Sequence, residues 1–310
     1  MDHIPWVEKY RPNHFDDIIL EKQNKIILQN MLQLNIIPQL LFYGPPGTGK
    51  TTTIINFIKN FQKKNKEEFQ ELIIHLNASD DRGIDTIRNQ IHSFTTSNYL
   101  FNKGTKFIIL DEVDYMTKNA QQALYNLIKT NTENVRFCLI CNYISKLEKS
   151  LQNICMSFKF NALPREKING FLHEIVKKEK LHNKITSHYI DNIISNYNSD
   201  IRSMINHIQS VGQNYSSQYK ILTTEGIKNL IDYFIENNQV DSESKFTSYL
   251  KHYNIEKRSL IMKIINYMIK HYDVTDTTIN FTRFIIRNKD YYLPHYNKFF
   301  ISNVVSLLSV

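Results

Sequence analysis

The residues of this chain that best fit phosphate chemistry stand in LLFYGPPGTGKTT, residues 41–53. Gly44, four residues, and then Gly49, Lys50 and Thr51 complete the pattern of a phosphate-binding loop. Such glycines let backbone amides close around phosphate oxygens, and the following helix N-terminus adds positive potential. We expect Lys50 to reach the β- and γ-phosphates and the Thr51 hydroxyl to bind Mg²⁺. A plain glycine turn before a helix is the competing interpretation. The residues expected to surround the triphosphate are Gly44, Pro45, Pro46, Gly47, Thr48, Gly49, Lys50, Thr51 and Thr52.

An acidic pair about 60 residues further on supplies the second part of this chemistry. In FIILDEVD, residues 107–114, four apolar residues lead into Asp111 and Glu112. Asp111 is suited to holding the metal through its water shell, and Glu112 to orienting and polarising an attacking water. An acidic strand end alone is more often a solvated cap, but its pairing with the loop favours an ATPase site. Asn142, which follows RFCLIC, is placed to bond the γ-phosphate or that water; taken alone it is only a turn residue.

Short apolar runs separated by helical stretches predict the elements that position these residues. Runs of this kind fit the buried strands of a parallel sheet joined by helices, whose ligands bind at the carboxyl edge. The runs are QLLFY (39–43), ELIIHL (71–76), FIIL (107–110) and RFCLIC (136–141). The sequence therefore predicts an α/β nucleotide-binding domain over residues 1–163.

After Pro164 the apolar spacing becomes helical and no further strand is expected. In SDIRSMINHIQSV the apolar residues 201, 204, 205, 208 and 211 share one helical face, with Ser199 or Asp200 as the N-cap. We predict a small helical domain over residues 164–228 and an all-α domain over residues 229–310.

Composition limits the classes of function. The net charge of +8 makes a polyanionic partner plausible, although part of this excess reflects compositional bias, and the basic cluster at residues 59–69 is interpreted as a solvated helix end. The chain has three cysteines; Cys138 and Cys141 form a CxxC without two further fitting ligands, which favours buried strand residues over a zinc site. No apolar stretch is long enough to cross a bilayer and the start lacks a signal-peptide core, so no membrane partner is expected.

Taken in order, five motifs resemble the small subunits of replication factor C, the sliding-clamp loader of the AAA+ class. The motifs are PWVEKYRP (5–12), the phosphate-binding loop, LNASDDRGIDTIRNQI (76–91), FIILDEVD and RFCLICNY. Within that family the resemblance is greatest to the subunit numbered three in yeast and five in mammals. It spans residues 5–210 and weakens beyond them.

The resemblance implies a AAA+ P-loop domain, a helical lid and a helical collar through which five subunits assemble. It implies ATP or ADP with Mg²⁺ at subunit interfaces, a PCNA-type sliding clamp and primer-template DNA as partners, and the nucleus as the location. Val7, Tyr10 and Arg11 would lie at the adenine side, with Asn142 as sensor 1 and Arg202 as sensor 2. Without the resemblance, Arg202 is an exposed residue in the first turn of a helix.

The DNA-facing candidates are Arg82 and Arg88, because arginines can contact phosphates without reading base sequence. Ordinary salt bridges to the neighbouring aspartates are an equally good interpretation of each arginine. FTTSNYLFNKG, residues 94–104, resembles the segment that presents apolar side chains to the clamp; a buried connection is the alternative.

The chain departs from the family where a subunit normally serves its neighbour's site. The family's Ser-Arg-Cys is replaced by Asn153-Ile154-Cys155, and isoleucine has neither charge nor donor. The helix after the acidic pair departs as well, with ALYN at residues 123–126 and Lys129 later. We expect an intact ATP site and a degenerate arginine-finger side, for which Lys149 or Lys159 could substitute in part. Two alternatives stay open: a subunit of this or a checkpoint-type loader that holds nucleotide without turnover, or another AAA+ DNA-processing ATPase.

Overall fold

The computed structural model describes residues 4–66, 70–79, 84–96, 104–130, 134–197, 199–213, 222–253, 255–288 and 295–308, with the side chains of 84–88 left aside. The chain divides into two compact units. The first comprises Met1–Ile175 and Tyr197–Asn206, and the second Val176–Asn196 and His207–Val310.

A five-stranded parallel sheet forms the centre of the first unit. Its order is β2-β3-β4-β1-β5, and every pairing is parallel. The strands are β1 (Leu40–Tyr43), β2 (Ile73–Asn77), β3 (Lys106–Asp111), β4 (Val135–Cys141) and β5 (Met156–Lys159). The predicted α/β fold with a parallel sheet is confirmed, and four strands coincide with the four apolar runs. The edge strand β5 was not predicted.

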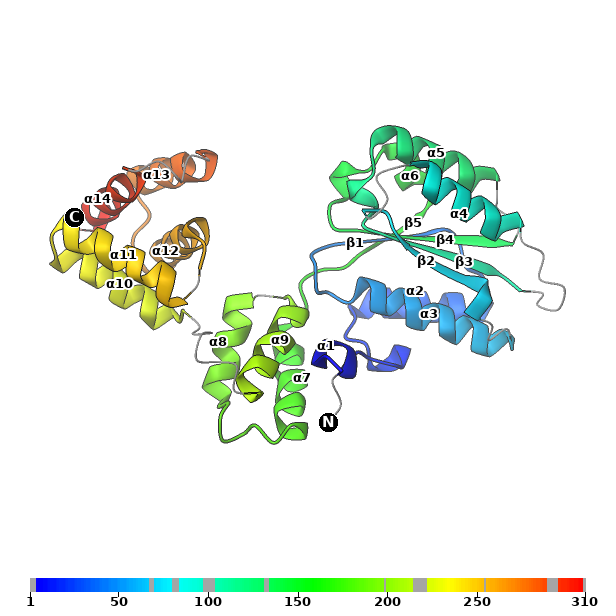
Figure 1. Ribbon diagram of the computed structural model, residues 1–310, viewed down its shortest axis with the longest axis horizontal. Coiled ribbons are helices and arrows are strands. Elements are labelled where there is room, and N and C mark those ends of the chain that lie inside the picture. The colour runs from blue at the N-terminus through cyan, green and yellow to red at the C-terminus, as the bar shows by residue number, and fades with distance from the viewer. Residues whose placement is uncertain are drawn as a thin grey trace. The chain divides into compact units, whose positions relative to one another are not determined.

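Helices cover both faces of this sheet (Figure 1). One face carries α2 (Lys22–Leu34) and α3 (Lys50–Asn65), and the other carries α4 (Ile84–Thr96), α5 (Lys118–Thr130) and α6 (Lys149–Ile154). Strand residues alternate between the two cores, as the two-residue period of a strand requires. Leu40 and Phe42 belong to the core under α2 and α3, whereas Leu41 belongs to the other. Short turns of helix lie between these elements or before them: α1 (Trp6–Lys9), η1 (Phe15–Asp17), η2 (Gln70–Leu72), η3 (Val113–Tyr115) and η4 (Ile144–Lys146).

Three helices follow the sheet: α7 (Arg165–Lys178), α8 (Ser187–Tyr197) and α9 (Ile201–Gly212). The predicted face of α9 is buried at its centre, where Met204, Ile205 and Ile208 have almost no exposed surface. Of the two candidate caps, Asp200 fills the role, because its Oδ1 accepts a hydrogen bond from the backbone N–H of Ser203 at 3.3 Å.

The rest of the second unit consists of helices in the residues that the structure describes. They are α10 (Thr224–Glu236), α11 (Gln239–Tyr253), α12 (Lys257–His271), α13 (Asp276–Arg287) and α14 (Tyr296–Leu308). Aromatic rings join them in one core: the ring of Phe246 lies 6.4 Å from that of Phe234 and 6.3 Å from that of Phe300. Phe300 in turn stacks on Phe281 at 5.9 Å. The predicted helical character of this region is confirmed.

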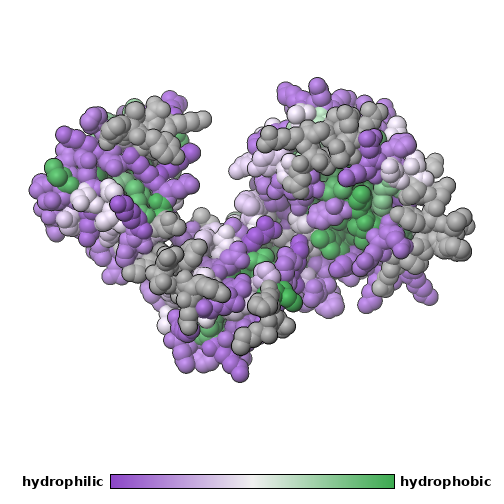
Figure 2. Space-filling view, in the orientation of Figure 1, coloured by the Kyte–Doolittle hydropathy of each residue, from purple (hydrophilic) through white to green (hydrophobic). Residues whose placement is uncertain are grey.

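Cys138 and Cys141 are both buried in β4, as the apolar-strand interpretation required. Within the described part of the chain no cluster of three or more histidine, cysteine, aspartate or glutamate side chains is arranged to hold a metal. No helix of the described residues is both long and apolar enough to span a membrane. The described residues on the face shown in Figure 2 are mostly hydrophilic.

Candidate nucleotide-binding site

The loop between β1 and α3 depends on glycines for two different reasons. Gly44, Gly47 and Gly49 all have positive φ, at 146°, 73° and 86°, which side chains adopt only with strain. A Cβ on Gly44 would lie 2.0 Å from the carbonyl oxygen of Phe160, and one on Gly47 would lie 2.2 Å from Oδ1 of Asp200. A Cβ on Gly49 would meet nothing within 4 Å. The loop therefore needs close approach at Gly44 and Gly47, and only backbone freedom at Gly49.

Lys50, the first residue of α3, turns its ammonium back into this loop. Its Nζ donates to the carbonyl oxygens of Gly44 and Pro45, both at 2.8 Å, and to Oδ1 of Asn142 at 2.9 Å. Burial lowers the pKa of Lys50, and the charge of Asp111 acts against that shift. A fixed cation thus lies among loop carbonyls beside the end of β4, in a position to bind a phosphate oxygen.

Thr51 and Asp111 form the second pair of the site. The Thr51 hydroxyl donates to Oδ2 of Asp111 at 2.8 Å, and Nε2 of His75 lies 4.0 Å from the same oxygen. A hydroxyl and a carboxylate are hard oxygen donors of the kind that Mg²⁺ prefers. The residues present therefore fit a magnesium ion that accompanies a bound nucleotide.

Glu112 has an unusual backbone conformation for a glutamate. It lies in the left-handed region at φ 58°, a conformation that costs a non-glycine residue of the order of 1 kcal/mol or more. Its N–H donates to Oδ1 of Asp111 at 2.9 Å, which holds the turn. The chain thus bends sharply after β3, and Glu112 lines the pocket beside Asp111.

The segment before α2 is hydrogen-bonded to α3 and forms one wall of the pocket. Nε of Arg11 donates to the Thr52 hydroxyl at 3.2 Å, and Nδ2 of Asn56 donates to the carbonyl of Pro12 at 2.9 Å. The Trp6 ring, which is buried, meets the ring of Tyr10 edge-on at 6.2 Å. These contacts hold Tyr10 and its neighbours at a set distance from the phosphate-binding loop.

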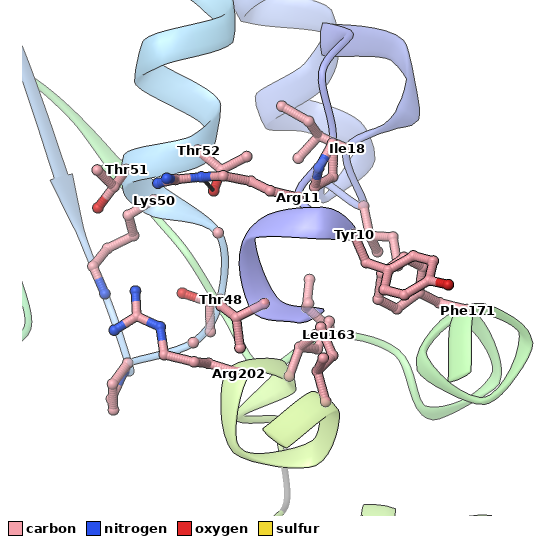
Figure 3. A pocket seen from close by; sticks show the side chains of 18 of the residues that line it. Tyr10, Arg11, Ile18, Thr48, Lys50, Thr51, Thr52, Leu163, Phe171 and Arg202 are labelled. Atoms are coloured by element: carbon pink, nitrogen blue, oxygen red, sulfur yellow. Dashed lines mark hydrogen bonds between the residues drawn. The ribbon is translucent and has the colours of Figure 1, made fainter. Parts of the chain in front are cut away.

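These parts enclose one pocket with two chemically different ends (Figure 3). At one end the side chains of Lys50, Thr51 and Arg202 gather around the loop; at the other, Tyr10 and Phe171 lie together. The cavity measures about 230 Å³. Of the predicted residues, it is lined by Val7, Tyr10, Arg11, Pro46, Gly47, Thr48, Gly49, Lys50, Thr51, Thr52, Asp111, Glu112, Asn142 and Arg202.

Two predicted loop residues contribute to the site in a different way. Gly44 and Pro45 do not line the pocket, but their carbonyl oxygens hold the Lys50 ammonium. Several apolar lining residues were not predicted, because they come from separate segments and share no spacing with any motif. They are Ile18, Ile19, Leu163, Phe171, Ile201 and Ile205.

The predicted DNA and clamp contacts fall outside what the structure describes. Arg82 lies outside the described residues. Arg88 belongs to α4, but its side chain is among those left aside. In the clamp-like segment, residues 97–103 also lie outside the described residues. These contacts therefore stay predictions.

The expected arginine-finger position lies at the end of α6. Ile154 is half-buried, Asn153 is exposed and Cys155 is buried directly after the helix. Lys149 is exposed at the start of α6, and Lys159 is exposed on β5. Both lysines thus have solvent access.

Comparison with known proteins gives concordant results. The profile of the ATPase family associated with various cellular activities (AAA) matches residues 40–161. Human replication factor C subunit 5 is 39% identical over 241 residues, covering 75% of this chain and 70% of that protein. Replication factor C subunit 3 of Saccharomyces cerevisiae is 41% identical over 209 residues, or 67% of this chain and 60% of its own. The replication factor C small subunit of Sulfolobus acidocaldarius is 33% identical over 270 residues, or 85% and 82%.

Among solved structures, a DNA polymerase III gamma subunit-related protein from Thermotoga maritima aligns over 90% of this chain and 97% of its own. The identity is 15% and the TM-score 0.48.

Proposed function

The chain belongs to the replication factor C family of AAA proteins, as its motifs predicted, and on this premise we propose that it binds and hydrolyses ATP as one subunit of a sliding-clamp loader. The observation that carries the proposal is the two-ended pocket. A cation among loop carbonyls and a hydroxyl–carboxylate pair suit a triphosphate with its metal, and the rings at the far end suit a purine base.

Each polar residue then has a separate part in hydrolysis. Lys50 and Arg202 stabilise negative charge on the phosphates, and Glu112 orients and activates the attacking water. Asn142, whose amide oxygen accepts a hydrogen bond from Lys50, helps to hold that water and the γ-phosphate. Thr51 and Asp111 would hold a magnesium ion, which would neutralise phosphate charge when bound.

The site is completed by an arginine from a neighbouring subunit. We infer that this chain supplies no arginine to the ATP site of its other neighbour, since Ile154 stands where the family has arginine. An Ile154→Arg variant should raise the hydrolysis of the assembled complex. If it leaves hydrolysis unchanged while Lys149→Ala or Lys159→Ala abolishes it, a lysine replaces the arginine and the interface is not degenerate.

The partners follow from the family. We propose that the chain assembles with other replication factor C subunits into a heteropentamer in the nucleus, and that this complex opens a PCNA-type clamp on primer-template DNA. Arg82 and Arg88 are the proposed DNA contacts. The helices after residue 228 are the proposed assembly surface.

Co-purification with labelled nucleotide tests the class of function. The chain should bind ATP in the presence of magnesium, and with the related subunits it should form a pentamer that retains a ring clamp only with ATP. A stable monomer that hydrolyses ATP by itself would contradict the proposal. Tight binding without turnover, even in the full assembly on clamp and DNA, would instead assign it the role of a nucleotide-holding subunit.

A further inference from the structure

We propose that Asp114 is a positioning residue for hydrolysis, which holds the backbone at the end of β4 so that Asn142 meets Lys50. The inference rests on the proposed ATPase function and adds to it a residue that does not line the pocket. Asp114 lies on η3, three positions after Asp111, and is only 5% exposed. It therefore faces the interior and not the pocket.

The two oxygens of this carboxylate accept from two consecutive backbone amides. The N–H of Asn142 points to Oδ1 at 3.4 Å, and the N–H of Tyr143 to Oδ2 at 3.2 Å. Both amides lie just beyond the last residue of β4, Cys141, where the strand ladder ends. N–H groups beyond the end of a strand ladder need another acceptor, and Asp114 supplies it for these two part-buried bonds.

These bonds link three segments of the site. Asp114 belongs to the turn that follows the acidic pair, and it holds the backbone of Asn142. The side chain of Asn142 accepts from the Lys50 ammonium at 2.9 Å. A carboxylate that accepts from backbone N–H groups makes charge-assisted bonds, and here one carboxylate accepts from two of them, at 3.4 and 3.2 Å. The orientation of Asn142 toward Lys50 thus depends on a side chain outside the pocket.

A second buried side chain joins the same two connections, from β3 to α5 and from β4 to α6, independently of Asp114. Nε2 of Gln121 donates to the carbonyl oxygens of Met116 and Lys146, both at 3.1 Å, and its Oε1 accepts from the N–H of Glu148 at 2.8 Å. Gln121 therefore holds these two connections together further from the pocket. Its presence provides a matched control, because its loss should loosen the fold without moving Asn142.

A double-mutant cycle tests the inference. Hydrolysis is measured in an assembly whose other subunits carry a substituted P-loop lysine, so that turnover reports this chain alone. Asp114→Ala should lower kcat about tenfold with little change in the affinity for ATP. In an Asn142→Ala background the same substitution should have almost no further effect, because Asp114 acts through Asn142. Asp114→Asn keeps one acceptor and should restore part of kcat.

The controls separate the possible outcomes. Gln121→Ala should lower the melting temperature and leave kcat nearly unchanged. The positioning role would be overturned if Asp114→Ala lowered kcat equally in the unmodified chain and in the Asn142→Ala variant, or if it left kcat of the otherwise unmodified chain unchanged. Either result would leave the ATPase function intact. Absence of turnover in the unmodified assembly would instead defeat the proposed function. If Asp114→Ala does not fold, the cycle is run with Asp114→Asn, and the same criteria apply.

Discussion

The ammonium of Lys50 lies 2.9 Å from the amide oxygen of Asn142, although 92 positions separate the two residues in sequence. Their meeting follows from the sheet. β1 and β4 are parallel neighbours, and the last residue of β1, Tyr43, is in register with the last residue of β4, Cys141. The loop after one strand therefore begins beside the residue that follows the other. This contact connects the residue proposed for phosphate binding to a residue proposed for hydrolysis.

The two partners should respond differently to substitution. Lys50→Ala removes the buried cation and should weaken ATP binding at least about tenfold. Asn142→Ala leaves Lys50 with its two carbonyl partners, so affinity should change little while kcat falls by about tenfold or more. Titration with a fluorescent ATP analogue and turnover assays on the assembly measure the two effects. Equal losses of affinity in both variants would contradict separate roles.

The effect of magnesium on ATP affinity should depend on the Thr51 hydroxyl. Chelation of the metal should weaken ATP binding to the unmodified chain, but Thr51→Val should bind ATP weakly both with and without magnesium. Thr53→Val is the matched control, because the Thr53 hydroxyl donates to the carbonyl of Gly49 instead of facing Asp111. It should lower stability by about 1 kcal/mol and keep the magnesium dependence, as calorimetric titration would show. A full magnesium response in Thr51→Val would exclude its hydroxyl as a ligand.

Two glycine substitutions should have opposite effects on stability. Gly47→Ala places a methyl group 2.2 Å from Oδ1 of Asp200 at a positive φ, and should lower the free energy of unfolding by about 2 kcal/mol. Gly170→Ala lies in α7 with no atom within 4 Å of the new Cβ, and should raise it by about 0.5 kcal/mol. Urea unfolding measures both. A neutral Gly47→Ala would mean that the loop and Asp200 separate readily.

The three cysteines should be unreactive in the folded protein. Burial raises the pKa of Cys141 and of Cys155 to about 12, and it raises that of Cys138 as well. A raised thiol pKa stabilises the folded state fully below the unfolded value of about 8.5, and this contribution is lost as the pH rises toward about 12. Ellman's reagent at about pH 8 should label the thiols only after denaturation. Rapid labelling of the native chain would show that β4, or the junction of α6 and β5 that holds Cys155, opens.

Much of the fold was predictable, because the central strands are continuous apolar runs in the sequence. Residues such as Phe42, Ile108 and Leu139 stand in continuous apolar runs, since helices cover both faces of a parallel sheet. The edge strand β5 escaped prediction because only Phe158 of its four residues is buried. An edge strand with one buried residue has neither a run nor an alternation that distinguishes it from a loop.

The polar end of the site was easier to foresee than the apolar end. Lys50, Thr51 and Asp111 belong to motifs with set spacing, because phosphate and metal chemistry need particular atoms. Phe171 and Leu163 contribute apolar surface, for which many residues and positions serve equally well. Asp114 was missed for another reason: its partners are the two backbone amides that follow β4, and only the sheet order brings them within reach.

The rate of ATP hydrolysis by the chain alone and in its assembly tests the central proposal most directly. We expect the isolated chain to bind ATP with almost no turnover, because an arginine from a neighbour is missing. Assembled with its partner subunits on clamp and primer-template DNA, the same site should turn over, and Glu112→Gln should abolish that turnover without loss of binding. The proposal would be contradicted if the isolated chain hydrolysed ATP as fast as the assembly, or if Glu112→Gln left the assembled rate unchanged.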